Sequence, residues 1–324
     1  QFPDFSLKDV LSAEWMKNLE SYLLDQFPVR EAFRSIKART LFYVFRQSDN
    51  NGIYVGENGH IFDMIYPLNE ESVQRFAQKL NSLYDKHLKN ANVYYAVIPD
   101  KSRYSQVSEK HLQTDWGRQM EILTQNINPG ITQISLMDTL TLDDYYRTDL
   151  HWRQERLFGV VERLGEHMGF RISADGLKEN SYAPFYGAYY GQSALSPEPD
   201  TLIFLTGGDI DCAVVDDIQH SDTKTVYRLD RLGEMDSYDV FLSGATPLIT
   251  IQNPNSTSGK SLIIFRDSFA SSLAPLLIEA YETITLIDLR YMSSEMLSQY
   301  VNFADQDVLF LYSEQIINNS VMLR

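Results

Sequence analysis

Residues 261–272 read SLIIFRDSFASS, and this stretch decides the fold class of the chain. Its first half, residues 261–265, is a short apolar run of the kind that forms a strand buried within a sheet. Its second half is rich in serine and holds Asp267, and these residue types commonly cap the start of a helix. The stretch therefore predicts a buried strand that leads directly into a helix.

Strands and helices alternate on both sides of this stretch. The expected strands are residues 93–98, 132–137, 283–288 and 308–312, with a hairpin over 52–62. The expected helices are residues 70–90, 115–126, 152–169, 272–281 and 293–303. Such an alternation predicts an α/β fold, with a mostly parallel sheet that helices cover on both faces.

This pattern divides the chain into four segments. Residues 1–50 carry apolar residues at helical spacing and predict an N-terminal helical segment. Residues 51–169 and 261–324 are expected to form the first and second parts of one α/β domain. Residues 170–260 are rich in Gly, Tyr, Asp and Ser and have only short apolar runs. We interpret them as a β-rich insertion, either a separate domain or a lid.

The charge balance and the single cysteine exclude several kinds of partner and site. The chain has 28 Lys and Arg against 44 Asp and Glu, a formal net charge of −16, so it repels phosphate backbones and nucleic acid is not expected as a partner. Cys212 is the only cysteine, which excludes an intrachain disulfide and a CxxC metal site. No apolar run approaches the roughly 18 residues of a membrane-spanning helix.

The segment YYRTDLHW, residues 145–152, is the first candidate for chemistry. Asp149 and His151 stand two residues apart before an expected helix, where the carboxylate can accept the imidazole Nδ1 proton and leave Nε2 free. That arrangement makes a general base. The alternative is structural: Thr148 or Asp149 caps the helix and His151 is a surface residue of its first turn.

Ser268 is the second candidate, because it joins the buried strand to the next helix. At this position it stands at the carboxyl end of a sheet strand, where α/β proteins place their sites, and the amides of a helix N-terminus can stabilise an oxyanion. A nucleophile fits there. The alternative is again capping, by Asp267, Ser268, Ser271 or Ser272. The chain lacks a GxSxG motif at this serine, so an α/β-hydrolase elbow is not indicated.

Considered together, the two motifs predict a Ser-His-Asp triad of Ser268, His151 and Asp149. Both motifs are expected at the same edge of a parallel sheet, and the insertion lies between them in the sequence. In a triad the serine attacks an ester, the histidine acts as general base and then acid, and the aspartate orients it. This chemistry needs no metal and no cofactor.

A metal site is the competing interpretation, because an Asp and a His two residues apart can also bind one ion. Further ligands would then be Asp143, Asp144 or Asp267. The other histidines stand singly, which does not favour this interpretation, and we expect no metal.

The insertion and the two motifs supply further candidates for substrate contacts. Residues 186–193, YGAYYGQS, offer aromatic faces and polar groups for a sugar ring through Tyr189, Tyr190, Gln192 and Ser193. The alternative is a Tyr/Gly turn with structural aromatics. Trp152 and Arg266, within the two motifs, are also oxyanion or substrate candidates.

At these motifs the sequence resembles the DHHW family of bacterial extracytoplasmic proteins, which is similar to the SGNH-hydrolase-like proteins of alginate O-acetylation. The matching stretches are residues 27–31, 56–59, 99–101, 145–152, 238–244, 266–272 and 286–291. The resemblance implies an SGNH-hydrolase-like three-layer α/β/α sandwich. It also implies that Ser268 is the nucleophile and that Asp149 and His151 complete the triad.

The resemblance further implies a function in adding or removing O-acetyl groups on a bacterial surface polysaccharide. Water as the second substrate makes the protein an acetylesterase, and a sugar hydroxyl makes it an O-acetyltransferase; the family favours transfer. The expected partners are the polysaccharide and a membrane-bound O-acyltransferase. The expected location is extracytoplasmic, by export or by an N-terminal tether that precedes Gln1.

Two positions depart from the family pattern. Leu150 stands where the family name has its first His, and Ala245 follows Phe-Leu-Ser-Gly where the family continues with Asn. If that Asn donates to the oxyanion, the backbone amide of Ser268 or the hydroxyl of Thr246 has to replace it here. The alternative function is therefore a catalytically degenerate carbohydrate-binding or scaffold protein of a polysaccharide-modification complex.

Overall fold

The computed structural model describes residue 49 and residues 52–105, 111–193, 198–234 and 236–324. The helical segment expected over residues 1–50 lies outside these ranges, apart from Asp49. Among the described residues, no helix combines the length and the apolar character that crossing a membrane requires.

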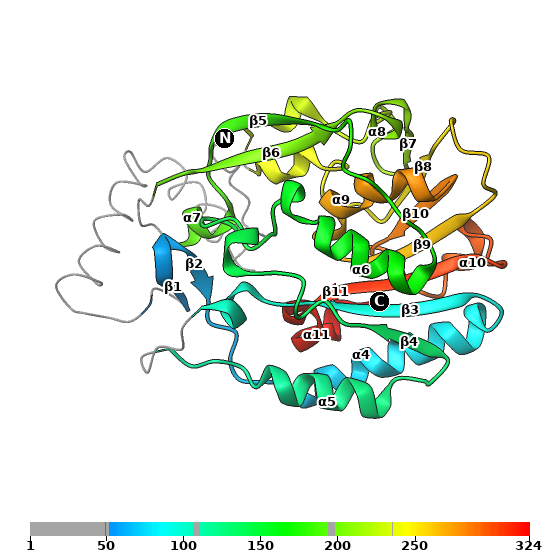
Figure 1. Cartoon of the computed structure of the whole chain (residues 1–324). Helices are drawn as coiled ribbons and strands as arrows, with labels where there is room; N and C mark the ends of the chain where they lie inside the picture. Colours follow the sequence, from blue (N-terminus) through cyan, green and yellow to red (C-terminus); the bar gives the residue numbers. More distant parts are fainter. Residues whose placement is uncertain (1–48, 50–51, 106–110, 194–197, 235) are drawn as a thin grey trace, which may run out of the picture.

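A seven-stranded sheet forms the centre of the fold, in the order β4-β3-β11-β9-β10-β8-β7 (Figure 1). Its strands are β3 (Asn92–Ile98), β4 (Ile131–Ile134), β7 (Val214–Asp217), β8 (Leu248–Gln252), β9 (Ser261–Arg266), β10 (Thr283–Ile287) and β11 (Asp307–Ser313). The neighbouring strands β4, β3, β11, β9 and β10 are parallel. At one edge, β8 pairs antiparallel with β10, and β7 pairs antiparallel with β8. The predicted α/β fold with a mostly parallel sheet is confirmed.

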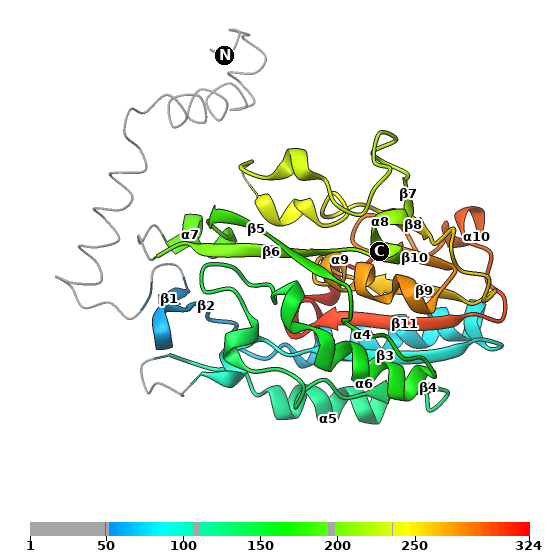
Figure 2. The same ribbon diagram turned by 45° about the horizontal axis from the view of Figure 1, so that its top comes forward.

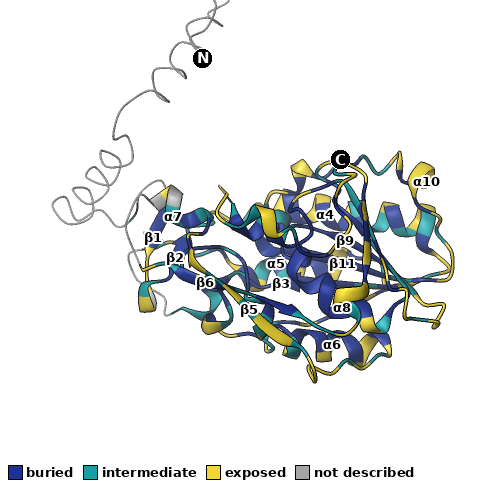
Figure 3. Cartoon of the chain, turned by 90° about the horizontal axis from the view of Figure 1, so that it is seen from above, coloured by how far each residue is buried: buried dark blue, intermediate teal, exposed yellow. Residues whose placement is uncertain are grey.

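Helices cover both faces of this sheet and complete a three-layer sandwich (Figure 2). One face carries α4 (Glu70–Leu83), α5 (Trp116–Asn126), α10 (Leu297–Tyr300) and α11 (Glu314–Asn318). The other face carries α6 (Phe158–Met168), α8 (Asp209–Cys212) and α9 (Ala270–Leu273). Buried residues gather on the strands between the two helical layers, and exposed residues lie on the outside (Figure 3).

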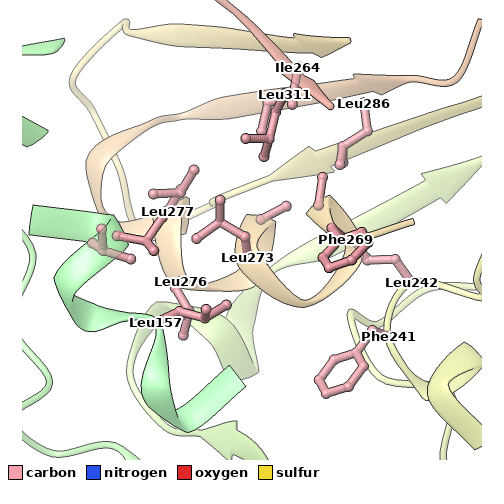
Figure 4. Packing of buried hydrophobic residues seen from close by; sticks show 14 of the residues in the cluster. Leu157, Phe241, Leu242, Ile264, Phe269, Leu273, Leu276, Leu277, Leu286 and Leu311 are labelled. Atoms are coloured by element: carbon pink, nitrogen blue, oxygen red, sulfur yellow. The ribbon is translucent and has the colours of Figure 1, made fainter. Parts of the chain in front are cut away.

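Strand β9 shows why its sequence is continuously apolar. Ile264 belongs to the core on one face of the sheet, and Ile263 and Phe265 belong to the core on the other. Figure 4 shows Ile264 beside Leu311 of β11, with Leu273 of α9 packed against this face. Because successive side chains of a strand point to opposite faces, a strand between two helical layers needs apolar residues at every position.

The segment 170–260 divides between two places. Strand β5 (Lys178–Phe185) pairs antiparallel with β6 (Asp200–Thr206) as a separate two-stranded sheet, and α7 (Ala188–Ser193) follows β5. Strands β7 and β8 instead extend the central sheet. The hairpin expected near the start is formed by β1 (Ile53–Val55) and β2 (Ile61–Asp63).

Several helices are shorter than the sequence pattern predicts, and two of the differences have local causes. The helix expected from Trp152 begins at Phe158, because Trp152 still pairs with Tyr145 in an isolated β-bridge. The helix expected over 272–281 is α9 followed by a 3₁₀ segment (Ala274–Ala280), since Pro275 has no N–H to continue an α-helical ladder. A π-helical turn (Tyr84–Leu88) extends α4.

Candidate active site

Ser268 lies in the turn between β9 and α9, at the carboxyl end of the central strands. The preceding residue fixes this turn: Asp267 Oδ1 accepts a hydrogen bond from the Phe269 amide (3.1 Å), and Oδ2 accepts one from the Ser313 amide at the end of β11 (2.8 Å). Asp267 and Phe269 are buried, whereas Ser268 is partly exposed. The turn therefore presents one hydroxyl group to solvent at the edge of the sheet.

Residues 145–152 form a loop that is anchored on the same turn. The amide of Tyr146 donates to the carbonyl of His151 (3.1 Å), which closes the loop on itself. The indole Nε1 of Trp152 donates to the carbonyl of Phe269 and to Ser272 Oγ, both at 3.0 Å. These bonds bring the loop against the start of α9, so its histidine lies beside Ser268.

Asp149, His151 and Ser268 form one hydrogen-bonded chain. His151 Nδ1 lies 2.6 Å from Asp149 Oδ1, and His151 Nε2 lies 2.7 Å from Ser268 Oγ, across 117 residues of sequence. The 2.7 Å distance allows the Ser268 proton to pass to His151 Nε2, and the 2.6 Å distance allows a hydrogen bond from His151 Nδ1 to the Asp149 carboxylate. The structure thus places the hydroxyl, the imidazole and the carboxylate in the order that nucleophilic catalysis by serine requires.

Asp149 is buried, and its surroundings keep it ionised. Burial raises the pKa of this carboxyl, but the charge of His151 and hydrogen bonds from His151 and the Ala188 amide outweigh burial and lower the pKa to about 2. The Ala188 amide at the start of α7 donates to Oδ2 (2.7 Å), and the His151 amide donates to Oδ1 (2.9 Å). Asp149 therefore binds the histidine and the first amide of α7, and it does not cap α6, the helix that follows its own loop.

Two aromatic rings hold the imidazole of His151 in place. Tyr238 stacks on it with a centroid distance of 3.8 Å and an interplanar angle of 7°, and Phe269 lies at 4.7 Å. The Tyr238 hydroxyl donates to Ser272 Oγ (2.8 Å). Tyr238 lies in residues 238–244, which match the family, but its place in the site was not predicted because its partner His151 is far away in the sequence.

Three of the predicted substrate or oxyanion candidates are buried behind the site. Arg266 donates to the Gly244 carbonyl and to Ser271 Oγ, both at 3.1 Å, and Trp152 is held as described above. Tyr189 packs with Ile53 of β1, and its hydroxyl accepts a hydrogen bond from Gln315. At these buried positions the three side chains support the loops around the site. We had predicted that they contact the substrate directly.

The other candidates lie in more varied surroundings. Thr246 is fully buried, and its hydroxyl has no hydrogen-bond partner within the described part of the chain. Tyr190 is half-buried and Gln192 is exposed, so both are accessible. The side chain of Ser193 lies outside what the structure describes. Ala245 is exposed, next to three successive residues with left-handed backbone, Leu242 to Gly244.

Two acidic residues of the competing metal interpretation, Asp267 and Asp144, accept hydrogen bonds from other groups. Asp267 accepts the two amides given above, and Asp144 Oδ2 accepts hydrogen bonds from the amide and the hydroxyl of Thr141. Within the described ranges, no three His, Cys, Asp or Glu side chains are grouped so that they could hold a metal ion.

Comparison with known proteins links this chain to one family. The model of the DHHW protein family matches residues 135–287. A DHHW family protein from Eubacterium siraeum DSM 15702 has a similar crystal structure, with a TM-score of 0.68 and 19% identity over 85% of this chain and 95% of that one. Bacillus cereus PatB1, solved with a sulfonyl adduct, gives a TM-score of 0.66 and 19% identity over 82% of this chain and 95% of that one.

A third solved structure is the O-acetyltransferase domain of Pseudomonas putida AlgJ, with a TM-score of 0.47 and 13% identity over 83% of this chain and 93% of that one. No curated protein sequence matches the chain. The fold is the SGNH-hydrolase-like α/β/α sandwich that the resemblance implied. The resemblance to the DHHW family is confirmed over residues 135–287, the part of the chain that holds Asp149, His151 and Ser268.

Proposed function

We propose that the chain is a serine O-acyl enzyme that transfers or hydrolyses O-acetyl groups of a bacterial surface polysaccharide. The observation that carries this proposal is the position of the His151 ring, 2.6 Å from Asp149 Oδ1 and 2.7 Å from Ser268 Oγ. A base with a buried, ionised orienting group on one side and a partly exposed hydroxyl on the other is the arrangement that activates serine.

In the first half of the proposed reaction, Ser268 Oγ attacks the carbonyl carbon of an acetyl ester. Its proton passes to His151 Nε2, and Asp149 stabilises the resulting imidazolium. The tetrahedral intermediate then breaks its bond to the alcohol oxygen, and His151 donates the proton to that leaving group. The products of this half are the free alcohol and an acetyl ester on Ser268.

In the second half, an acceptor hydroxyl attacks the acetyl group on Ser268. His151 removes the proton of the acceptor and then returns a proton to Ser268 Oγ as the serine leaves. A sugar hydroxyl as acceptor gives transfer, and water gives hydrolysis. The DHHW match supports transfer, and with it an extracytoplasmic location and a membrane-bound O-acyltransferase as partner.

The negative oxygen of the intermediate needs hydrogen-bond donors, and Ala245 provides no side-chain donor. We assign this function to the backbone amide of Ser268 and to the hydroxyl of Thr246. Thr246 is supported by its buried hydroxyl, which has no partner among the described residues. Loss of one such donor typically costs about 10²- to 10³-fold in rate, so Thr246→Val tests the assignment.

The experiment that tests the function measures acetate release from p-nitrophenyl acetate and from an O-acetylated oligosaccharide. We expect turnover by the wild type, its loss in Ser268→Ala, and no change in Ser258→Ala, which replaces an exposed serine that precedes β9, at the opposite end of that strand from Ser268. Turnover that survives in Ser268→Ala contradicts the proposal.

The alternative is a carbohydrate-binding protein without activity. It is favoured by Ala245, which stands where the family has an Asn and has no side-chain donor for the oxyanion. It predicts no acetyl release by the wild type, together with equal affinity of the wild type and Ser268→Ala for polysaccharide fragments. Isothermal titration with unacetylated oligosaccharide measures this affinity.

A further inference from the structure

Lys101 is a fully buried lysine directly behind the candidate site. It follows β3 and begins a 3₁₀ turn (Lys101–Tyr104), and only 2% of it is exposed. Its Nζ donates to three backbone carbonyls of the loop that carries the acid, those of Asp149 (2.6 Å), Tyr146 (3.0 Å) and Arg147 (3.3 Å). One ammonium group therefore donates hydrogen bonds to three carbonyls within residues 146–149.

The charge of this lysine has no carboxylate at ion-pair distance within the described part of the chain. Aromatic faces of Phe62 and Tyr189 lie 5.4 and 5.0 Å from Nζ, and the remaining contacts are the three carbonyls. Burial of an ammonium group is costly, and an apolar side chain would fill the same space at a lower cost. The ammonium instead provides hydrogen-bond donors that hold the backbone of this loop in one position.

We propose that Lys101 is a positioning residue for the triad: its ammonium holds the backbone of residues 146–149 so that the Asp149 carboxylate faces His151. This inference rests on the function proposed above, because it assigns Lys101 to the same reaction. The 2.6 Å bond to the Asp149 carbonyl fixes the residue whose side chain orients the histidine. Lys101 does not reach Ser268 or His151 itself, and it acts through Asp149.

The protonation of Lys101 gives the proposal a second, independent readout. Burial lowers the pKa of Lys101 to about 8, against the opposing charges of Asp149, Asp100 and Asp200. His60 also faces this charge, and burial together with Lys101 lowers its pKa to about 4, so His60 is neutral near pH 8. As the pH rises through about 8, Lys101 loses its proton, and its hold on the three carbonyls weakens.

The experiment compares Lys101→Met with Lys101→Arg, with Lys79→Met as the matched control. Lys79 is a half-buried lysine on α4 that contacts Ser294, remote from the loop. We expect Lys101→Met to lower kcat by about 10- to 100-fold with KM little changed, since a small displacement of an orienting group has effects of this size. Lys79→Met keeps the wild-type kcat. Lys101→Arg, whose charge persists, moves the alkaline fall in kcat to higher pH.

The second measurement is proton NMR of the hydrogen bond between His151 Nδ1 and Asp149, which gives a resonance far downfield. In the wild type we expect this signal to disappear as the pH rises through about 8, and in Lys101→Met we expect it to be absent at pH 7. This readout needs no substrate, so it tests Lys101 even if the acetyl activity fails. A signal that persists unchanged in folded Lys101→Met and in the wild type at pH 9 overturns the inference.

Discussion

The phenol ring of Tyr238 lies flat on the imidazole of His151, with ring centroids 3.8 Å apart and planes inclined by only 7°. The two residues come from segments far apart in the sequence, and both rings are buried. A histidine that accepts and returns a proton in one reaction must keep its ring plane fixed, because both of its nitrogens have partners to face. The stacked ring supplies that constraint.

We therefore expect Tyr238→Ala to lower kcat by up to about 100-fold, because the imidazole gains freedom to turn away from Ser268. Tyr238→Phe keeps the stacked ring and loses only the hydrogen bond to Ser272, so its kcat remains close to that of the wild type. Acetyl-ester turnover of the two variants measures the difference. Equal losses in both variants would assign the effect to the hydroxyl instead of the ring.

Gly187 is a position where the site has no room for a side chain. A Cβ atom on Gly187 would overlap Asp149 Cβ and would stand 2.6 Å from Asp149 Oδ2. We predict that Gly187→Ala displaces Asp149 and reduces turnover by about 100-fold. Gly117→Ala is the control: on the exposed face of α5 its Cβ meets Asp115 Oδ1 only at 3.4 Å, and alanine favours a helix. Crystal structures and turnover of the two variants check this contrast.

Asp149→Asn distinguishes an orienting carboxylate from a capping residue. Asn caps a helix about as well as Asp, so a capping role predicts unchanged turnover. An amide in place of the carboxylate stabilises the wrong tautomer of the histidine, and in serine proteases this lowers turnover by about 10⁴-fold. We expect a loss of that order. If Asp149→Asn kept the turnover of the wild type, Asp149 would not orient His151 and would have no part in the mechanism.

The same substitution has an effect on stability that depends on pH. The pKa of Asp149 is lowered from 3.8 to about 2 in the folded chain, so its ionised form stabilises the fold above pH 4, and this contribution is lost as the pH falls through 2. At about 1.4 kcal/mol for each pKa unit, the contribution is on the order of 2 kcal/mol. Urea unfolding should show Asp149→Asn less stable than the wild type at pH 6. The difference should narrow as the pH approaches 2, and a difference independent of pH would contradict this account.

The fold could be predicted from the sequence because its central strand is constrained on both sides. A run such as residues 261–265 is apolar at every position only where both faces are covered, and the serines after it start a helix. The helix ends were less predictable. Pro275 converts the continuation of α9 to a 3₁₀ segment, and the bridge between Tyr145 and Trp152 moves the start of α6 to a later residue. Neither effect changes the spacing of apolar residues from which the helices were predicted.

In the site, the sequence could indicate the catalytic candidates, which stand at the ends of strands. It could not indicate the residues that hold those candidates in position. Ser268 and the pair Asp149 and His151 were recognisable because nucleophile and base occupy the carboxyl edge of a parallel sheet. Lys101 and Tyr238 lie in stretches that match the family, residues 99–101 and 238–244, but no function in the site was predicted for them because their partners lie in other segments of the chain. Trp152, Arg266 and Tyr189 were expected at the substrate, but each is buried and makes hydrogen bonds within the fold.

The central claim is that Ser268 carries the acetyl group, and peptide mapping after an acid quench tests it most directly. The wild type is mixed with p-nitrophenyl acetate for a few seconds, quenched, digested and examined by mass spectrometry, with Ser268→Ala and Ser258→Ala treated in parallel. The account predicts an acetyl group on the peptide that contains Ser268 in the wild type and in Ser258→Ala, and no acetyl group on the corresponding peptide of Ser268→Ala. Turnover of the ester without acetylated Ser268, or an equal acetyl load on Ser268→Ala, would contradict it.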